Sequence, residues 1–374
     1  MNDSSALQLS SGRYIQGHGA LASLPEEILP MGTKVLILTD KVVYPKVQQQ
    51  VESSFAKAGI TFQIFLFNGY CSPTNYDGGA VAGQKMGAEV VVGMGGGRIM
   101  DAAKIVADKL GVRAITVPTS AATCAATALL AVHYSDEGAF WGNYWPKYPP
   151  AVTIADLDII VNDCPTRYNA AGIIDAMAKL PEISYNISYS EQWKKNILSH
   201  LSSSIAQKTF DLFLENGKEV VSKMEQGIAD DQVEDVVAAA LSVTGLVSCL
   251  AAGGKQAAIS HCLYSYFCNM TPELAERFLH GELVGASLPY QVIVNSEDYH
   301  QAAVLADFIR SLGAPTCLDD LGFAPTEEQM DGLYEFLYSR MPVSDKVEQH
   351  RLRKYADILL HGVAAQKEQC SCGK

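Results

Sequence analysis

Three consecutive glycines, Gly95, Gly96 and Gly97, form the first group of residues with a possible chemical use. They lie between the apolar run EVVVGM (89–94) and a stretch of helical periodicity that carries Asp101. Glycines at a strand-to-helix turn let the backbone approach a ligand closely, and the N–H groups of a helix N-terminus attract a phosphate. Because the stretch does not follow the G-x-G-x-x-G pattern, the glycines alone indicate either a phosphate site or a tight turn.

Asp40 directly follows the apolar run KVLILT (34–39). A carboxylate at the end of a strand can accept hydrogen bonds from an adenosine ribose and repels a 2′-phosphate, which favours NAD over NADP. In the ordinary dinucleotide fold this acid follows the glycines, whereas Asp40 precedes them, so a different strand order must bring them together. The alternative is an ordinary aspartate in a turn.

A second group of residues is typical of a metal site. His261 and His280 lie in strongly apolar helical stretches, and Asp175 lies in the similar stretch GIIDAMAKL. A buried imidazole or carboxylate needs a partner, because an uncompensated polar group in an apolar environment is costly. One carboxylate and two imidazoles leave an open position on a divalent cation, which suits catalytic zinc. Core histidines with ordinary hydrogen-bond partners are the alternative.

The composition narrows the class of protein. The chain has 374 residues, a formal net charge of −13 and 48% hydrophobic residues, which together argue for a large core and against nucleic-acid binding. No run of about 18 uninterrupted apolar residues occurs, so no membrane-spanning helix is expected. The N-terminus MNDSSALQLSSGRY does not resemble a secretion signal. We therefore expect a cytoplasmic protein.

Nine cysteines are scattered along the chain without C-x-x-C spacing. In a reducing compartment such cysteines are mostly small buried hydrophobic residues. Cys370 and Cys372, in the tail CSCGK, allow a metal site, but a frayed and unimportant tail is the favoured interpretation.

These residues must be positioned by two kinds of element. Up to about residue 120, short β-branched runs alternate with helical periods, which is typical of a parallel α/β layer. The predicted strands are 34–39, 61–67, 89–94 and 114–118, and the predicted helices are 44–59, a helix through 86, and 99–111. After residue 160 helical periods dominate: 167–180, 232–252, 256–267 and 274–294. The sequence predicts a dinucleotide-binding α/β domain over 1–162 and an all-α metal and substrate domain over 163–374.

Ordered segments across the chain resemble the metal-dependent polyol dehydrogenases of the glycerol dehydrogenase and iron-containing alcohol dehydrogenase superfamily. The segments are RYIQGHGALASLPEEI, VVGMGGGRIMDAAKIVA, VPTSAATCAATALLAVHYSDEGAF, AAGIIDAMAK, ISHCL and LHGELVGASL. The resemblance implies a dehydroquinate synthase-like fold, NAD and a divalent metal as cofactors, and a homo-oligomer. It also implies that the enzyme oxidises a small polyol or 2-hydroxy acid, with the metal as Lewis acid and NAD as hydride acceptor.

Site residues follow from the resemblance position by position. The metal ligands would be Asp175, His261 and His280, and catalysis would act through the metal. His261 is the least secure, because its segment is nearer that of the sn-glycerol-1-phosphate dehydrogenases, whose activity is an alternative. The residues implied in cofactor binding are Asp40, Gly95, Gly96, Gly97, Asp101, Thr119, Thr123, Leu130 and Val132.

Two departures from the family pattern concern substrate and metal. Cys124 stands where glycerol dehydrogenases have an Asp that holds a substrate hydroxyl, and it is similar to the cysteine of the hydroxycarboxylate dehydrogenase branch. Lys179 stands where iron-dependent members have a fourth ligand, His, so three ligands remain and zinc is favoured over iron. Arg98 and Lys179 are candidates to receive a substrate carboxylate or phosphate, although a solvated or structural charge is the favoured interpretation of each.

Two other classes of function are possible on the same residues. Dehydroquinate synthase resembles this superfamily and uses NAD and a metal in a lyase-type reaction without net redox change, but its basic phosphate-binding segments have no counterpart here. A catalytically silent binding protein is the other alternative. The Asp/His/His set argues against it, because binding alone would not need an open metal position.

Overall fold

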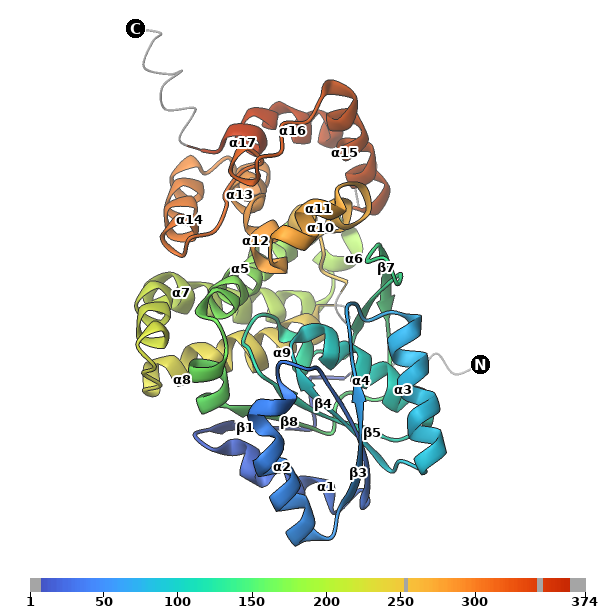
Figure 1. Cartoon of the computed structure of the whole chain (residues 1–374). Helices are drawn as coiled ribbons and strands as arrows, with labels where there is room; N and C mark the ends of the chain where they lie inside the picture. The colour runs from blue at the N-terminus through green and yellow to red at the C-terminus, as the bar shows by residue number, and fades with distance from the viewer. Residues whose placement is uncertain (1–7, 252–254, 342–345, 364–374) are drawn as a thin grey trace, which may run out of the picture. The chain divides into compact units, whose positions relative to one another are not determined.

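The computed structural model describes residues 8–251, 255–341 and 346–363, and Figure 1 shows the chain from end to end. The chain divides into two compact units. The first comprises Met1–Asn169 and Ser222–Gly254, and the second comprises Ala170–Val221 and Lys255–Lys374. Cys370 and Cys372 lie outside the described residues.

A six-stranded parallel sheet forms the centre of the first unit, with the strand order β1-β8-β5-β4-β2-β3. Its strands are β1 (Arg13–Gly17), β2 (Lys34–Thr39), β3 (Thr61–Leu66), β4 (Val90–Gly95), β5 (Arg113–Pro118) and β8 (Val152–Asp156). The helical segments of this unit up to β8 are η1 (Ala20–Ser23), α1 (Leu24–Ile28), α2 (Tyr44–Ala58), α3 (Pro73–Met86), α4 (Gly97–Leu110) and η2 (Cys124–Ala126). The predicted parallel α/β architecture is confirmed.

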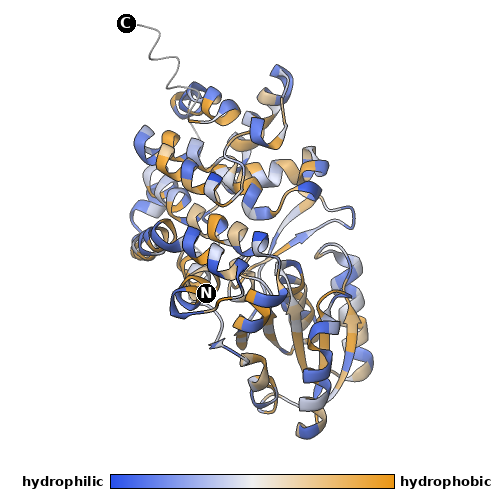
Figure 2. Cartoon of the chain, turned by 60° about the vertical axis from the view of Figure 1, so that its left-hand side comes forward, coloured by the Kyte–Doolittle hydropathy of each residue, from blue (hydrophilic) through white to orange (hydrophobic). Residues whose placement is uncertain are grey.

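Helices cover both faces of this sheet because its side chains alternate between them. On one face, Val35 and Ile37 of β2 join a buried cluster with α1 and with Val47 and Phe55 of α2. On the other face, the Leu38 side chain lies against Gly79 of α3. The strands are largely hydrophobic and the helices alternate between hydrophilic and hydrophobic residues along their length (Figure 2). The sheet is therefore doubly wound.

Two strands, β1 and β8, were not among the strands predicted from sequence. β1 is short and only partly buried, so its periodicity is weak. β8 is buried along its whole length but runs directly into η3 (Ile159–Asp163), a π-helical turn, so the sequence shows no strand boundary there. Both segments are strands because β8 pairs with β1 on one side and with β5 on the other.

An antiparallel hairpin follows η2 and consists of β6 (Ala131–Tyr134) and β7 (Phe140–Tyr144). Its first strand and its turn lie in VPTSAATCAATALLAVHYSDEGAF (117–140), one of the segments that resemble the dehydrogenase superfamily. The hairpin begins at Ala131, so residues 119–130 form the loop that joins β5 to it.

The helical segment of 222–254 belongs to the first unit and consists of α8 (Asp231–Ala238), the π-helical turn η4 (Ala239–Val243) and α9 (Thr244–Leu250). Gln16 Nε2 of β1 donates to Glu234 O at 2.8 Å, and Thr127 Oγ1 donates to Leu241 O. By length and composition Asp231–Leu250 could cross a membrane, but 67% of its apolar window is buried inside the structure, as in a core helix. The segment therefore completes the core of the α/β unit.

The second unit is helical throughout the part that the structure describes. Its elements are α5 (Thr166–Tyr189), α6 (Glu191–Lys194), α7 (Ile197–Glu225), α10 (Ile259–Met270), α11 (Pro272–Arg277), α12 (His280–Gly285), α13 (Leu288–Ser296), α14 (Tyr299–Ser311), η5 (Asp319–Leu321), α15 (Glu327–Arg340), α16 (Lys346–Lys354) and α17 (Ala356–His361). The predicted helical period over 274–294 divides into three helices, because Phe278 and Leu279 have extended backbone between α11 and α12 and Pro289 lies at the start of α13.

The division into units differs from the single boundary predicted after residue 162. The first unit extends to Asn169 and also contains residues 222–254, which the prediction placed in the helical domain. Helical periodicity identified the helices 232–252 but not the sheet on which they pack, because an apolar helix face has the same pattern in either unit.

Candidate metal and dinucleotide sites

The glycine turn joins β4 to α4 in the first unit. Gly95 has φ +155°, and a side chain on it would collide with Ile99. A Cβ on Gly97 would lie 2.8 Å from Thr123 Oγ1, whereas a Cβ on Gly96 would meet nothing within 4 Å. The N–H groups of Gly97 and Arg98 precede the hydrogen bonds of α4, which begin where the Ile99 N–H donates to Gly96 O at 3.0 Å. The turn therefore offers open space beside backbone donors, which fits a phosphate.

Lys104 ties the loop after β5 to α4. Its side chain is fully buried, and Nζ lies 2.8 Å from Asp101 Oδ1. Nζ also donates to the carbonyl oxygens of Ala125 at 2.9 Å, of Ala128 at 3.1 Å and of Leu130. One ammonium thus neutralises a buried carboxylate and satisfies three carbonyl groups of the loop.

Asp101 completes this arrangement from the other side. Its Oδ2 accepts the N–H of Val132 at 3.2 Å, so the carboxylate holds the start of the hairpin. The chain that carries Thr119, Thr123, Leu130 and Val132 is therefore fastened to α4 by the Asp101–Lys104 pair. Lys104 lies in the segment VVGMGGGRIMDAAKIVA, but it was given no role from the sequence alone.

Thr119 and Thr123 lie on the loop beside the glycine turn. The N–H of Thr119 donates to Gly95 O at 3.0 Å, and Thr123 Oγ1 accepts the N–H of Ala125 at 3.3 Å. Cys124 is buried, and its Sγ lies 3.8 Å from Ser248 Oγ. The structure thus brings both threonines to the glycine turn, with Cys124 adjoining Thr123 in the chain.

Asp40 lies at the carboxyl end of β2, which pairs directly with β4. Its Oδ1 accepts the N–H groups of Val42 at 2.8 Å and Val43 at 2.7 Å. The side chain therefore forms the turn that the alternative interpretation expected. Because parallel strands end at the same edge, the same position places Asp40 beside the strand that leads into the glycine turn.

Asp175, His261 and His280 come together in the second unit. His261 Nε2 lies 3.1 Å and His280 Nε2 3.2 Å from Asp175 Oδ1, and one ligand atom from each residue lies within 4.8 Å of the others. The three side chains come from α5, α10 and α12. Gly281 lets α12 approach α5, because a Cβ there would collide with Ala171 O.

The electrostatics of this cluster keep its carboxylate ionised. Burial alone would raise the pKa of Asp175, but Lys179 and the two imidazoles outweigh it and hold that pKa well below its ordinary value. Burial lowers the pKa of His280, despite Asp175. Asp175 thus stays ionised and His280 neutral near pH 7, the forms that bind a metal. Burial alone would lower the pKa of His261, but Glu182 and Asp175 outweigh it and raise that pKa.

Glu182 orients His261 and was missed by sequence reasoning. Its side chain is fully buried, and Oε2 lies 2.6 Å from His261 Nδ1. Oε1 accepts the N–H groups of Ala258 and His261, each at 2.9 Å. A proton on Nδ1, shared with Glu182, leaves the Nε2 lone pair directed at the cluster, as in carboxylate–histidine–metal arrangements. The signal in the sequence is the i+7 spacing from Asp175, which returns Glu182 to the same helix face.

Replacing Glu182 with Gln is expected to weaken zinc binding by about 10- to 100-fold. The amide oxygen can accept the same two backbone N–H groups, so the NH₂ group then faces His261 Nδ1. Nδ1 must accept a hydrogen bond from it, and the imidazole proton therefore lies on Nε2, the atom that would bind the metal. Competition with a chromophoric zinc chelator measures the affinity. Glu215→Gln, an exposed exchange on α7, is the control, and equal affinity of the two variants would contradict the orienting role.

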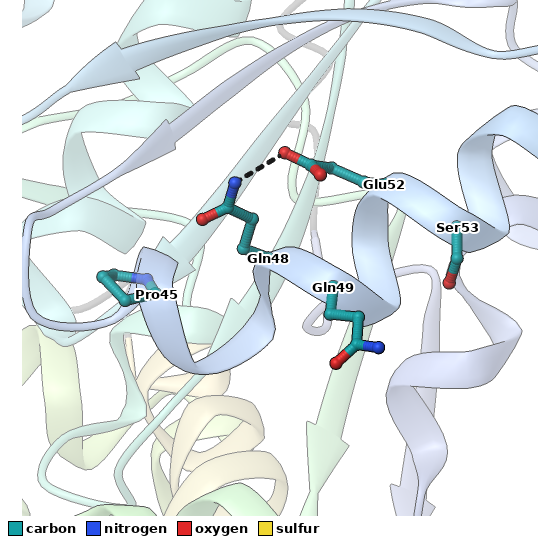
Figure 3. A pocket seen from close by; sticks show the side chains of 5 residues that line it. All are labelled: Pro45, Gln48, Gln49, Glu52 and Ser53. Carbon is teal, nitrogen blue, oxygen red and sulfur yellow. Dashed lines mark hydrogen bonds between the residues drawn. The ribbon is translucent and has the colours of Figure 1, made fainter.

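A surface pocket along α2 contains none of these residues. It is lined by Pro45, Gln48, Gln49, Glu52 and Ser53 (Figure 3). All five are exposed and belong to one helix, and Gln48 Nε2 donates to Glu52 Oε1 at 2.8 Å. Nothing in this pocket resembles a catalytic or metal-binding arrangement.

Known proteins share both the sequence and the fold. Residues 11–157 match the model of the iron-containing alcohol dehydrogenases. A glycerol dehydrogenase of Thermotoga maritima is 30% identical over 318 residues, which cover 83% of each chain. The chain belongs to the iron-containing alcohol dehydrogenase family.

Two further members extend the comparison. Hydroxycarboxylate dehydrogenase A of Escherichia coli is 30% identical over 267 residues, covering 68% of this chain and 69% of that protein. The crystal structure of glycerol dehydrogenase from Schizosaccharomyces pombe matches with a TM-score of 0.84 and 22% identity, covering 100% of this chain and 94% of the other. The predicted superfamily and fold class are confirmed, as is an enzyme of the alcohol dehydrogenase class. NAD and a divalent metal fit this family.

Proposed function

We propose that this member of the iron-containing alcohol dehydrogenase family is an NAD-dependent, divalent-metal-assisted enzyme that interconverts a small polyol or 2-hydroxy acid with its ketone or 2-oxo acid. The observation that carries the proposal is the buried Asp175, His261 and His280 cluster, oriented by Glu182. A divalent cation held there would act as a Lewis acid toward a substrate oxygen. Three ligands favour zinc over iron, because three protein ligands and an open position are typical of catalytic zinc.

The cofactor is assigned to the first unit and the metal to the second. The N–H groups at Gly96 and Gly97 would hold the pyrophosphate, and Thr119, Thr123, Leu130 and Val132 would line the path toward the nicotinamide. Asp101 would contribute by holding the loop through Lys104 and the Val132 N–H. Asp40 would contact the adenosine ribose.

Replacing Asp40 with Asn is expected to raise the NADP-to-NAD ratio of kcat/KM by about tenfold or more, because the negative charge that repels a 2′-phosphate is lost. The amide oxygen can still accept the N–H groups of Val42 and Val43, so the turn is kept. Initial rates with the two cofactors measure the ratio. An unchanged ratio with unaltered thermal stability would show that Asp40 serves only the turn.

The names of relatives and one side chain bear on the substrate. Relatives include glycerol dehydrogenases and a hydroxycarboxylate dehydrogenase. At Cys124 a buried thiol stands where the glycerol branch has a carboxylate. A thiol is a weak hydrogen-bond partner for a substrate hydroxyl, so 2-hydroxy acids are favoured over glycerol.

Replacing Cys124 with Asp is expected to raise glycerol or 1,2-diol oxidation relative to 2-hydroxy acid oxidation by about tenfold, since the carboxylate accepts a hydrogen bond from the second hydroxyl. Cys124→Ser, which keeps the size without the charge, is the matched control. Unchanged relative rates in the Asp variant would remove Cys124 from substrate selection.

The proposed function is tested by the initial rate of NADH formation. Metal-stripped protein is supplied with Zn²⁺, Mn²⁺ or Fe²⁺ and offered glycerol, 1,2-diols, 2-hydroxy acids and glycerol 1-phosphate. Metal-dependent NADH formation with one of these classes supports the proposal. Absence of NADH with every substrate, despite tight binding of NAD and metal, would favour a non-redox lyase or a binding protein.

We also propose a cytoplasmic homo-oligomer that binds neither nucleic acid nor membrane. Scattered cysteines without C-x-x-C spacing are typical of proteins of reducing compartments. The net charge of −13 disfavours a polyanionic partner. Sedimentation analysis of the purified protein tests the oligomeric state.

A further inference from the structure

Lys179 is a buried cation at the Asp175, His261 and His280 cluster. It lies one helical turn after Asp175 on α5, and its side chain is 7% exposed. Nζ lies 3.2 Å from His261 Nε2 and 3.7 Å from Asp175 Oδ1. This burial excludes a solvated charge and leaves the structural charge, the other interpretation that the sequence favoured. Arg98, the other candidate cation, instead stacks on the Tyr70 ring at 4.2 Å in the first unit.

The charges of the cluster depend on whether a metal is bound. The carboxylates of Asp175 and Glu182 and the ammonium of Lys179 act on one another together with the two imidazoles. When both imidazoles are neutral, which is the form that binds a metal, these groups carry one excess negative charge. A divalent cation reverses the balance to one excess positive charge. An uncompensated charge in a buried site is costly, so the metal-loaded cluster is complementary to a single negative charge.

We infer that Lys179 receives the carboxylate of the substrate and thereby makes 2-hydroxy and 2-oxo monocarboxylic acids, not neutral polyols, the preferred substrate class. The inference rests on the proposed function, whose metal ligands Lys179 contacts. A carboxylate forms a charge-assisted hydrogen bond with the ammonium, whereas the second hydroxyl of a polyol forms only a weaker one.

The reaction balances without a proton from Lys179. The C2–H bond of the 2-hydroxy acid breaks and its electron pair moves with the hydrogen to NAD⁺, while the hydroxyl proton goes to water. The products are the 2-oxo acid, NADH and one proton. Lys179 binds and orients the carboxylate, which remains unchanged throughout.

The test compares two substrates that share a three-carbon frame, lactate and 1,2-propanediol, in zinc-loaded protein. In Lys179→Met the lactate-to-propanediol ratio of kcat/KM is expected to fall by about 30-fold, mainly through the KM for lactate. Lys179→Arg, which keeps the charge, restores part of the ratio. Lys179→Gln is a second neutral variant in case the Met variant does not fold, and Lys208→Met, an exposed exchange on α7, is the control.

A binding measurement provides a readout without turnover. Calorimetric titration of oxamate, a carboxylate that does not react, into zinc-loaded protein with NADH is expected to show weaker binding in Lys179→Met by a similar factor, at unchanged zinc content. Unchanged oxamate affinity, or an equal loss with lactate and propanediol accompanied by loss of zinc, would overturn the inference. If wild-type protein forms NADH from neither substrate, the proposed function fails separately, and oxamate binding still decides the role of Lys179.

Discussion

Replacing Asp175 with Asn is expected to abolish stoichiometric zinc binding and to lower kcat/KM by about 1,000-fold, because a catalytic metal supplies several kcal/mol of stabilisation to the transition state. Asp175 Oδ1 lies within 3.2 Å of the Nε2 atoms of both His261 and His280, so the amide keeps the shape of the cluster but removes its anionic ligand. Atomic absorption and initial NADH rates measure the two effects.

The same exchange tests the electrostatics of the cluster in metal-free protein. The pKa of Asp175 is held well below its ordinary value, so its contribution to folding stability is present above the pKa of the unfolded chain. This contribution is lost as the pH falls through the lower pKa of the folded state. Metal-free Asp175→Asn should therefore be less stable than wild type at pH 7, since Lys179 loses its carboxylate partner. Glu215→Gln is the control, and full zinc occupancy in Asp175→Asn would contradict the assignment.

Replacing Lys104 with Met is expected to lower the free energy of unfolding by about 3–5 kcal/mol, because it leaves a buried carboxylate without its cation. The Asp101 side chain is 9% exposed, and three loop carbonyl groups lose the same donor. We also expect weaker NAD binding, since the loop carrying Thr119 and Thr123 is no longer fastened to α4. Guanidinium denaturation and NADH fluorescence titration measure these effects.

Two comparisons isolate the cause of this loss. Lys109→Met removes a partly exposed ion pair with Asp77 from the same helix and should cost less than about 1 kcal/mol. Asp101→Asn combined with Lys104→Met removes the stranded charge and should recover part of the stability. The contrary result is a double variant that loses as much free energy of unfolding as the two single variants lose together. That result would show that the contacts of Lys104 with the carbonyl groups, and not its ion pair with Asp101, cause the loss.

Much of the α/β half could be predicted from sequence because its signals are local. The runs at 34–39, 61–67, 89–94 and 114–118 are apolar and correspond to β2, β3, β4 and β5. β1 and β8 are equally part of the sheet, but one is half-exposed and the other passes directly into a π-helical turn. Their strand character depends on partners far away in the sequence.

The candidate metal ligands could also be predicted from their neighbours in the sequence, whereas their contacts with other helices could not. A histidine or aspartate in an apolar helix is visible in the sequence because an unpaired polar group would be costly there. Asp175, His261 and His280 were therefore predicted together. The sequence did not show that Glu182 reaches His261, or that Lys179 is buried against it, because both contacts join α5 to α10.

By itself the sequence determined the types of chemistry this protein can perform: a glycine turn for phosphate, a strand-end aspartate, and one carboxylate and two imidazoles in apolar surroundings. Only the tertiary structure decided which charges these groups meet, and which unit the helices at 222–254 complete. The physical reason is that periodicity reports whether a side chain is buried, whereas the energy of a buried charge depends on the few atoms within about 4 Å of it. Lys104 and Lys179 lie about one helical turn after Asp101 and Asp175, a spacing that the sequence shows. The loop carbonyl groups around Lys104 and the imidazole of His261 beside Lys179 come from other elements, so folding alone decides those contacts.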